Sequence, residues 1–125
     1  MDAEKIFQKY RNLEIFMPYG IKSFEDPGMD GDTPVHAAAY MGDTEALTVM
    51  LPLVSSIELR GGIGNSPLHL AILGGNPDAV EVLLAAGADL FCENDYGDKP
   101  SDFIDKNASE ISGVISRYTQ KLGSG

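Results

Sequence analysis

A period of 33 residues organises this sequence. The block Thr33-Pro34-Val35-His36-Ala37-Ala38 recurs as Ser66-Pro67-Leu68-His69-Leu70-Ala71, and a weaker copy begins at Lys99-Pro100. Glycines keep the same step: Gly31, Gly64 and Gly97 precede the blocks, and Gly42 and Gly75 follow the first two. A repeat of this length predicts a stack of similar units, because each unit must bury its apolar face against its neighbour.

Each unit has the signals of two short helices. A Thr or Ser before Pro favours a helix N-terminus, because the hydroxyl caps free N–H groups and the proline has none to leave unpaired. A glycine after the block suits the left-handed residue that ends a helix. Asn76-Pro77 opens the next helix, with Val80, Leu83 and Leu84 on one stripe. The structural motif of the repeats therefore comprises Thr33, Pro34, His36, Gly42, Ser66, Pro67, His69, Gly75 and Gly87.

These blocks resemble ankyrin repeats, which combine a Thr-Pro-Leu-His-x-Ala block, a glycine after the first helix and Gly-Ala-Asp after the second. The last element is Gly87-Ala88-Asp89 here, and residues 31–104 carry the resemblance. It implies an all-α solenoid of stacked helix-turn-helix units with hairpin-like fingers, capped by terminal helices. We expect one domain over residues 1–125: an N-terminal helical cap (1–22), repeat 1 (28–60), repeat 2 (61–93), a degenerate C-terminal capping repeat (94–122) and a flexible tail (123–125).

The chain departs from the family pattern in places that predict local differences. Pro52 should end the second helix of repeat 1 early. In the last repeat, Asp102 replaces the histidine and Lys99 replaces the capping hydroxyl. Apolar residues at helical spacing predict a covering helix over residues 2–17 and another near the C-terminus. They are Ile6, Phe7, Tyr10, Leu13 and Phe16 in the first, and Ile111, Val114, Ile115, Tyr118 and Leu122 in the second.

No combination of residues predicts a reaction centre. His36 and His69 occupy equivalent positions, but no third ligand supports a zinc site, so we expect each imidazole to bond its Thr or Ser cap and the neighbouring turn. Cys92 has no basic residue nearby and is close to Glu93 and Asp95, so nothing in the sequence activates its thiol. The glycines of residues 61–64 lack the lysine of a phosphate-binding loop, and the acidic turns lack the calcium-loop order. We predict no enzyme activity, no metal and no cofactor.

Charge narrows the class of partner. The net charge is −10, and residues 23–105 alone hold 2 basic and 15 acidic side chains, a net charge of −13. Such a chain repels nucleic acid and anionic membrane surfaces. Because it also lacks a long apolar run, a visible secretory signal and a second cysteine to pair with Cys92, we predict a cytoplasmic protein.

The resemblance also implies a partner-binding surface, made of the turn tips and the concave face of the first helices. Several of its residues are apolar or aromatic where an isolated stack would be wet, which is typical of an interaction site. The residues that the pattern assigns to protein binding are Met29, Asp30, Asp32, Tyr40, Met41, Arg60, Gly62, Ile63, Asn65, Leu73, Glu93, Asp95, Tyr96, Asp98, Lys106 and Asn107.

Two hypotheses follow for the role of this surface. The acidic repeats favour a basic partner drawn in by electrostatic steering, as for a stoichiometric inhibitor or an immunity protein that neutralises a basic toxin. The alternative is a scaffold or assembly subunit that joins a larger complex through the apolar patch. In both cases we expect a monomer when the protein is unbound.

Overall fold

The computed structural model describes residues 2–104 and 109–123, the last segment with the side chains of residues 110–118. The α-helices are α1 (Ala3–Arg11), α2 (Pro34–Met41), α3 (Thr44–Met50), α4 (Pro67–Leu73), α5 (Pro77–Ala85) and α6 (Ser109–Gly123). The short 3₁₀ helices are η1 (Met17–Tyr19), η2 (Met29–Gly31), η3 (Leu51–Leu53), η4 (Gly62–Gly64) and η5 (Pro100–Phe103). No strand occurs among the residues described, so the predicted all-α class is confirmed.

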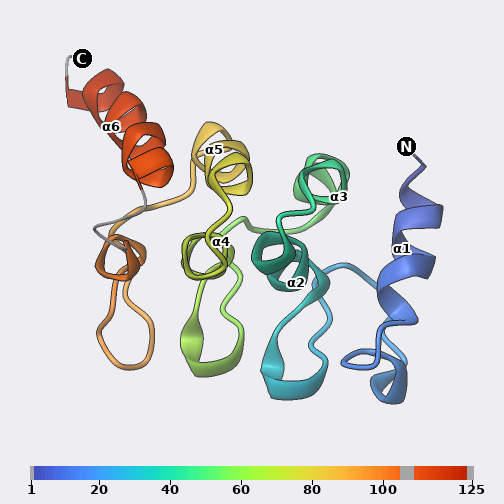
Figure 1. The fold of residues 1–125 in the computed structure, drawn as a ribbon. Coiled ribbons are helices and arrows are strands. Elements are labelled where there is room, and N and C mark those ends of the chain that lie inside the picture. Colours follow the sequence, from blue (N-terminus) through green and yellow to red (C-terminus); the bar gives the residue numbers. More distant parts are fainter. Residues whose placement is uncertain (1, 105–108, 124–125) are drawn as a thin grey trace.

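The helices form two rows that advance along the stack (Figure 1). An inner row consists of α2, α4 and η5, and an outer row of α3, α5 and α6, with neighbours in each row packed side by side. Between the outer helix of one unit and the inner helix of the next, the chain forms a loop that projects away from the helices. We name these loops finger 1 (residues 28–32), finger 2 (61–65) and finger 3 (94–98). The predicted solenoid with fingers is confirmed.

The inner helices begin where the repeated blocks predict. The Thr33 hydroxyl accepts a hydrogen bond from the His36 N–H, and the Thr33 N–H donates to His36 Nδ1 at 3.2 Å. Ser66 and His69 repeat this reciprocal cap, with an N–H to Nδ1 distance of 3.0 Å. The histidine ring thus takes the place of the Glu or Gln of an ordinary capping box.

The same helices end at left-handed glycines. Gly42 caps α2 with φ of 74°, and Gly75 follows α4 with φ of 71°. Glycine adopts this conformation without a steric penalty, so the chain can turn sharply into the outer helix. Pro52 ends α3 early, as the sequence predicts, and the chain continues as η3.

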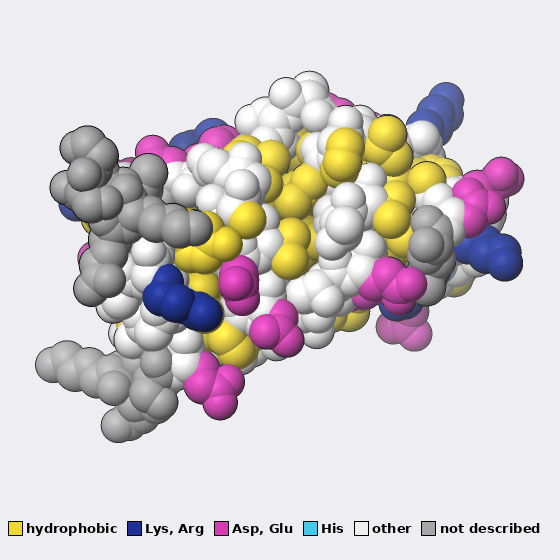
Figure 2. Space-filling view, turned by 90° about the horizontal axis from the view of Figure 1, so that it is seen from above, with side chains coloured by type: hydrophobic (Ala, Val, Ile, Leu, Met, Phe, Trp, Pro, Cys, Tyr) yellow, Lys and Arg dark blue, Asp and Glu magenta, His cyan; other side chains and the backbone are white. Residues whose placement is uncertain are grey.

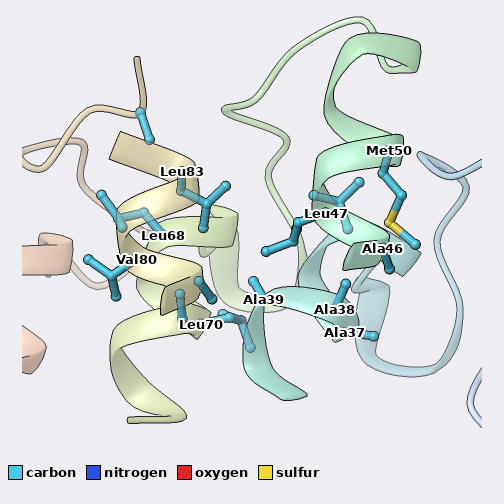
Figure 3. Close-up of a cluster of buried hydrophobic side chains, with 14 of the residues drawn as sticks. Ala37, Ala38, Ala39, Ala46, Leu47, Met50, Leu68, Leu70, Val80 and Leu83 are labelled. Atoms are coloured by element: carbon cyan, nitrogen blue, oxygen red, sulfur yellow. The ribbon is translucent and has the colours of Figure 1, made fainter. Parts of the chain in front are cut away.

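The core lies between the two rows. Leu47 and Met50 of α3, Leu68 of α4 and Leu83 of α5 have no exposed surface, and they belong to one buried cluster with the alanines of α2 (Figure 3). Ala38 and Ala39 leave room for α4 to pack closely on α2. Burial of one such Leu removes its side chain from water and stabilises the fold by about 1.5–3 kcal/mol.

The N-terminal cap differs from the predicted helix over residues 2–17. The helix α1 ends at Arg11, because Asn12 takes up the cap and the Leu13 N–H bonds back to the Tyr10 carbonyl. The chain then turns, and Phe16 reaches the core from the turn rather than from a helix. The apolar spacing therefore identified the buried residues but overestimated the helix length.

The last repeat keeps the outer helix but shortens the inner one. The first helix is reduced to the four residues of η5, where the Asp102 carboxylate accepts the Lys99 N–H at 2.8 Å. The apolar face of α6 is buried through Ile111, Val114 and Ile115, and α6 packs on α5. The helix extends to Gly123, the first residue of the expected tail; residues 124–125 and the Leu122 side chain lie outside the described part.

Asn76 occupies the predicted N-cap position but does not cap α5 with its side chain. Instead, its amide nitrogen donates to the carbonyl oxygens of Ala39 at 3.3 Å and Tyr40 at 2.6 Å. These carbonyls belong to the last turn of α2, where a helix runs out of its own N–H donors; the Ala39 carbonyl also accepts the Gly42 N–H at 3.3 Å. The Asn76 side chain therefore satisfies the helix end of the preceding unit instead of its own.

Candidate interaction surface

The three fingers share one hairpin-like fold. In each of them, the first residue donates its backbone N–H to the carbonyl of the last at 2.9 Å: Gly28 to Asp32, Gly61 to Asn65, and Asn94 to Asp98. The tips of fingers 1 and 2 are the 3₁₀ helices η2 and η4. The segments predicted as turns between the units are therefore loops that close with the same backbone hydrogen bond.

Hydrogen bonds also join each finger to the next. The Asp32 carboxylate of finger 1 accepts the Gly62 N–H of finger 2 at 2.9 Å. The Ile63 carbonyl of finger 2 accepts the Asp95 N–H of finger 3 at 2.8 Å. Because hydrogen bonds join each finger to the next, the fingers form one connected row in the unbound protein.

Each of the three fingers carries one exposed apolar side chain near its tip. Met29 is 45%, Ile63 48% and Tyr96 73% exposed. The acidic residues Asp30 and Asp95 lie beside them and are also exposed. We refer to these five residues as the finger-tip row.

A second exposed set lies at the other end of the inner helices. Tyr40 and Met41 close α2, and Leu73, one period after Tyr40, closes α4. We refer to these three residues as the helix-end row. Each finger leads into the start of an inner helix, and α2 spans eight residues, so the two rows are separated by about 12 Å of helix. The exposed residues thus form two rows rather than one cluster.

Asn65, which the repeat pattern assigns to the binding surface, forms an internal contact between fingers. Its side chain is buried, with 6% of the residue exposed, and its amide oxygen accepts a hydrogen bond from the Asn94 amide at 2.9 Å. Its carbonyl contacts His36 Nε2 at 2.7 Å. The bond to Asn94 holds finger 2 against finger 3, and the contact with His36 joins finger 2 to α2.

Other polar residues of the predicted set have internal roles. Arg60 pairs with Asp95 at 2.6 Å and donates to the Glu93 carbonyl at 3.0 Å. Asp32 and Asp98 are half-buried beside Gly62 and His69 respectively, whereas Asp30, Glu93 and Asp95 are exposed. Lys106 and Asn107 lie outside the described residues.

Both histidines are structural links between units. His36 Nδ1 accepts the Thr33 N–H, so Nε2 carries the proton and donates to the carbonyls of Leu59 at 3.0 Å and Asn65 at 2.7 Å. His69 Nε2 donates to the Asp98 carbonyl at 2.8 Å. Burial lowers the pKa of both rings, which keeps them neutral at pH 7. Among the described residues, no three His, Cys, Asp or Glu side chains form a group that could hold a metal ion.

The Cys92 thiol is not in an activating environment. The residue is half-buried, and its Sγ donates to the Asp89 carbonyl at 3.4 Å. Burial raises the pKa of Cys92, and the nearby Glu58 and Asp89 carboxylates raise it further. Because the thiolate is the reactive form, this thiol is a weaker nucleophile at pH 7 than a free cysteine.

Among the residues that the structure describes, four large exposed apolar side chains lie outside the predicted surface: Met17, Tyr19, Leu53 and Phe91. Phe91 borders a mostly apolar hollow of about 280 Å³ that is also lined by Leu84, Leu90 and Tyr118. Figure 2, which views the molecule from the side of the outer helices, shows apolar side chains along its middle and Lys and Arg side chains toward its ends. The 33-residue period does not predict that these four residues are exposed, because they lie outside the segments that the repeats share.

Comparison with protein families agrees with this architecture. The sequence matches the family model of ankyrin repeats, in three copies, over residues 6–94, which is more than two thirds of the chain. A comparison with curated proteins finds no match. No helix in the described part of the chain is long and apolar enough to cross a membrane. Ankyrin repeats are generic protein–protein interaction modules and are typically non-catalytic. Given the stacked units, the fingers and this match, the chain belongs to the ankyrin repeat family.

Proposed function

We propose that this protein binds a basic partner protein, without catalysis, and acts as its stoichiometric inhibitor, for example as an immunity protein that neutralises a basic toxin. The observation that carries the proposal is the finger-tip row, where apolar and acidic side chains are exposed together on a segment of net charge −13. An inhibitor needs only to cover a surface, and a small rigid stack suits that task.

The apolar side chains of the finger-tip row supply the contact area. Met29, Ile63 and Tyr96 stand on separate fingers, and inter-finger hydrogen bonds hold those fingers in place. A surface that is ordered before binding loses little side-chain and loop entropy when the partner arrives. Aromatic residues such as Tyr96 are also over-represented among the residues that dominate binding energy.

The acidic side chains favour a partner that carries positive charge. Two ion pairs form among the described residues, Lys9–Asp43 and Arg60–Asp95, and Asp30 and Glu93 belong to neither. Their charge is exposed and attracts Lys and Arg side chains at long range. We therefore expect fast association at low ionic strength that slows steeply as salt is added.

A second candidate function rests on the helix-end row. Tyr40, Met41 and Leu73 are exposed at the ends of two adjacent helices, about 12 Å of helix away from the finger tips. A surface of this kind favours a scaffold or assembly subunit that binds mainly through apolar contact. Such binding survives high salt, whereas binding by the finger-tip row weakens.

Affinity capture from cells of the source organism, at low and at high salt, tests the proposal. The baits are the wild type, a charge variant (Asp30→Asn with Glu93→Gln) and an apolar variant (Tyr40→Ser with Leu73→Ser). Inhibition requires a basic protein that the wild type retains at low salt and the charge variant loses. That protein's own activity must then fall to its minimum at an equimolar amount of inhibitor. Retention that survives high salt and depends on Tyr40 and Leu73 supports the scaffold instead.

The free protein is expected to be a monomer. Light scattering coupled to size-exclusion chromatography measures this directly, before and after addition of the captured partner. A stable dimer of the isolated chain contradicts the expectation.

A further inference from the structure

Ile63, at the tip of finger 2, has an unusual backbone conformation. Its φ of 52° lies in the left-handed region, and the residue is β-branched. Asp30, one period earlier at the tip of finger 1, has a φ of 66°. Asp tolerates this region because its short polar side chain bonds locally, whereas a branched side chain clashes with its own backbone. The tips of fingers 1 and 2 therefore both contain a left-handed residue, and of the two Ile63 is the residue type that this conformation disfavours.

The surrounding contacts prevent Ile63 from relaxing. The Gly61 N–H is bonded to the Asn65 carbonyl within the finger, and the Ile63 carbonyl accepts the Asp95 N–H of finger 3. On the other side, the carbonyl oxygen of Asp30 lies where a Cβ of residue 62 would stand, so finger 1 is packed directly on finger 2. Strained backbone persists where its surroundings fix it in this way.

The fold gains little from the isoleucine. Its side chain is 48% exposed and is not among the described apolar residues that pack against the core. Asn, Asp or Gly would satisfy the turn with less strain. A strained residue that exposes its apolar side chain is explained when a partner binds that side chain.

We infer that Ile63 is the central anchor of the interface and inserts into an apolar pocket on the partner, with Lys or Arg groups at the rim of that pocket. Finger 1 places Asp30 on one side of Ile63, and finger 3 places Asp95 and Tyr96 on the other. The acidic neighbours determine the charge of the rim, and the isoleucine determines the apolar character of its centre. This inference rests on the proposed function and names the residue that carries it.

The first part of the test measures strain. Ile63→Asn removes the branched side chain and keeps a residue that tolerates the left-handed region. We expect its unfolding equilibrium constant in urea to fall by about fivefold or more relative to wild type. Asp30→Asn is the matched control at the equivalent tip, and it should leave that constant nearly unchanged. A lower stability of Ile63→Asn overturns the inference, because the isoleucine is then a structural residue.

The second part measures binding with a defined probe. A phage-displayed library of short random peptides is selected against the wild type, and the enriched peptides are synthesised. We expect them to combine apolar residues with Lys or Arg, and to bind Ile63→Asn about tenfold more weakly or worse. Leu53→Asn, which alters an exposed apolar residue of η3, controls for general loss of apolar surface and should leave binding unchanged.

The outcomes separate the two claims. Peptides that are basic, lose affinity with Asp30→Asn and bind Ile63→Asn as well as wild type overturn the anchor but leave the proposed function standing. Peptides without basic residues, whose binding is insensitive to salt, overturn the basic partner. A selection that enriches no peptide counts against both.

Discussion

The ring of His36 bonds to the backbone carbonyl of Asn65, which belongs to the next repeat, at 2.7 Å. One unit later, His69 makes the same bond to Asp98 at 2.8 Å. Each ring also closes the cap of its own inner helix through Nδ1. A single buried imidazole thus starts one helix and fixes the finger that follows it, so the histidine of the block serves the fold.

Loss of this ring should destabilise the protein without removing an activity. We expect His36→Ala to lower the free energy of unfolding by about 2–4 kcal/mol, because the Asn65 carbonyl and the Thr33 N–H both lose a buried partner. Urea denaturation followed by circular dichroism measures the change. Asp102→Ala, at the exposed equivalent position of the last repeat, should lower the free energy of unfolding much less. A His36→Ala variant as stable as wild type contradicts the assigned role.

Stability should decline in mildly acidic solution. Burial lowers the pKa of His36 and His69 below the value of about 6.5 that they have in the unfolded chain. The unfolded state then binds more protons, so their contribution is fully present above pH 6.5 and is lost as the pH falls below it. The free energy of unfolding at pH 7.5 and pH 5.5 tests this.

Glu58 opposes the histidines and needs a control. Burial raises the pKa of its carboxyl, so its contribution is present below the unfolded value and declines as the pH rises through the folded one. In a Glu58→Gln background, the decline between pH 7.5 and pH 5.5 should therefore be steeper. A stability that increases toward pH 5.5 in this background refutes the account of the histidines.

Tyr10 should contribute more than Lys9 to the stability of the N-terminal cap. The Tyr10 hydroxyl donates to Asp43 at 2.7 Å from a fully buried ring, and Lys9 pairs with the same carboxylate at 2.8 Å from an exposed position. Burial raises the pKa of Tyr10 well above its usual value, and the hydrogen bond to Asp43 raises it further. We expect Tyr10→Phe to lose about 1–2 kcal/mol and Lys9→Met about 0–1 kcal/mol, by thermal or urea unfolding. A larger loss of stability for Lys9→Met than for Tyr10→Phe would contradict this expectation.

Two glycines should respond oppositely to alanine. Gly113 lies inside α6, and a Cβ there meets no atom within 4 Å, so Gly113→Ala should stabilise the protein by about 0.5–1 kcal/mol. Gly62→Ala places a Cβ on the carbonyl oxygen of Asp30 and should force fingers 1 and 2 apart. Amide chemical shifts of residues 30 and 62 report that separation, and unchanged shifts contradict it.

The period predicted the fold well because helix signals recur within it. The capped starts at Thr33 and Ser66 and the left-handed glycines are local features that need no knowledge of distant contacts. The cap over residues 2–17 was predicted less accurately, since apolar spacing marks which residues face the core but does not mark where a helix ends. At Asn12 the chain leaves the helix, and Phe16 still reaches the core.

The interaction surface was harder to predict, for two physical reasons. Equivalence in the repeat says that Tyr40 and Leu73 are neighbours, but it gives no distance from them to Ile63, and the structure separates them into two rows. Asn65 occupies a turn and would be expected in water. Its side chain is buried because it pairs with Asn94 of the next finger, and neither residue alone carries a sequence signal for that pair.

Asn76 ties the start of α5 to the end of α2. Removal of repeat 2 would therefore leave the Tyr40 carbonyl without the Asn76 donor, and removal of repeat 1 would leave the Asn76 amide without its two acceptors. We expect the chain to melt in one cooperative transition rather than unit by unit. We therefore expect the assembled stack to be the smallest stable unit, and a single repeat cut from it to be unstructured.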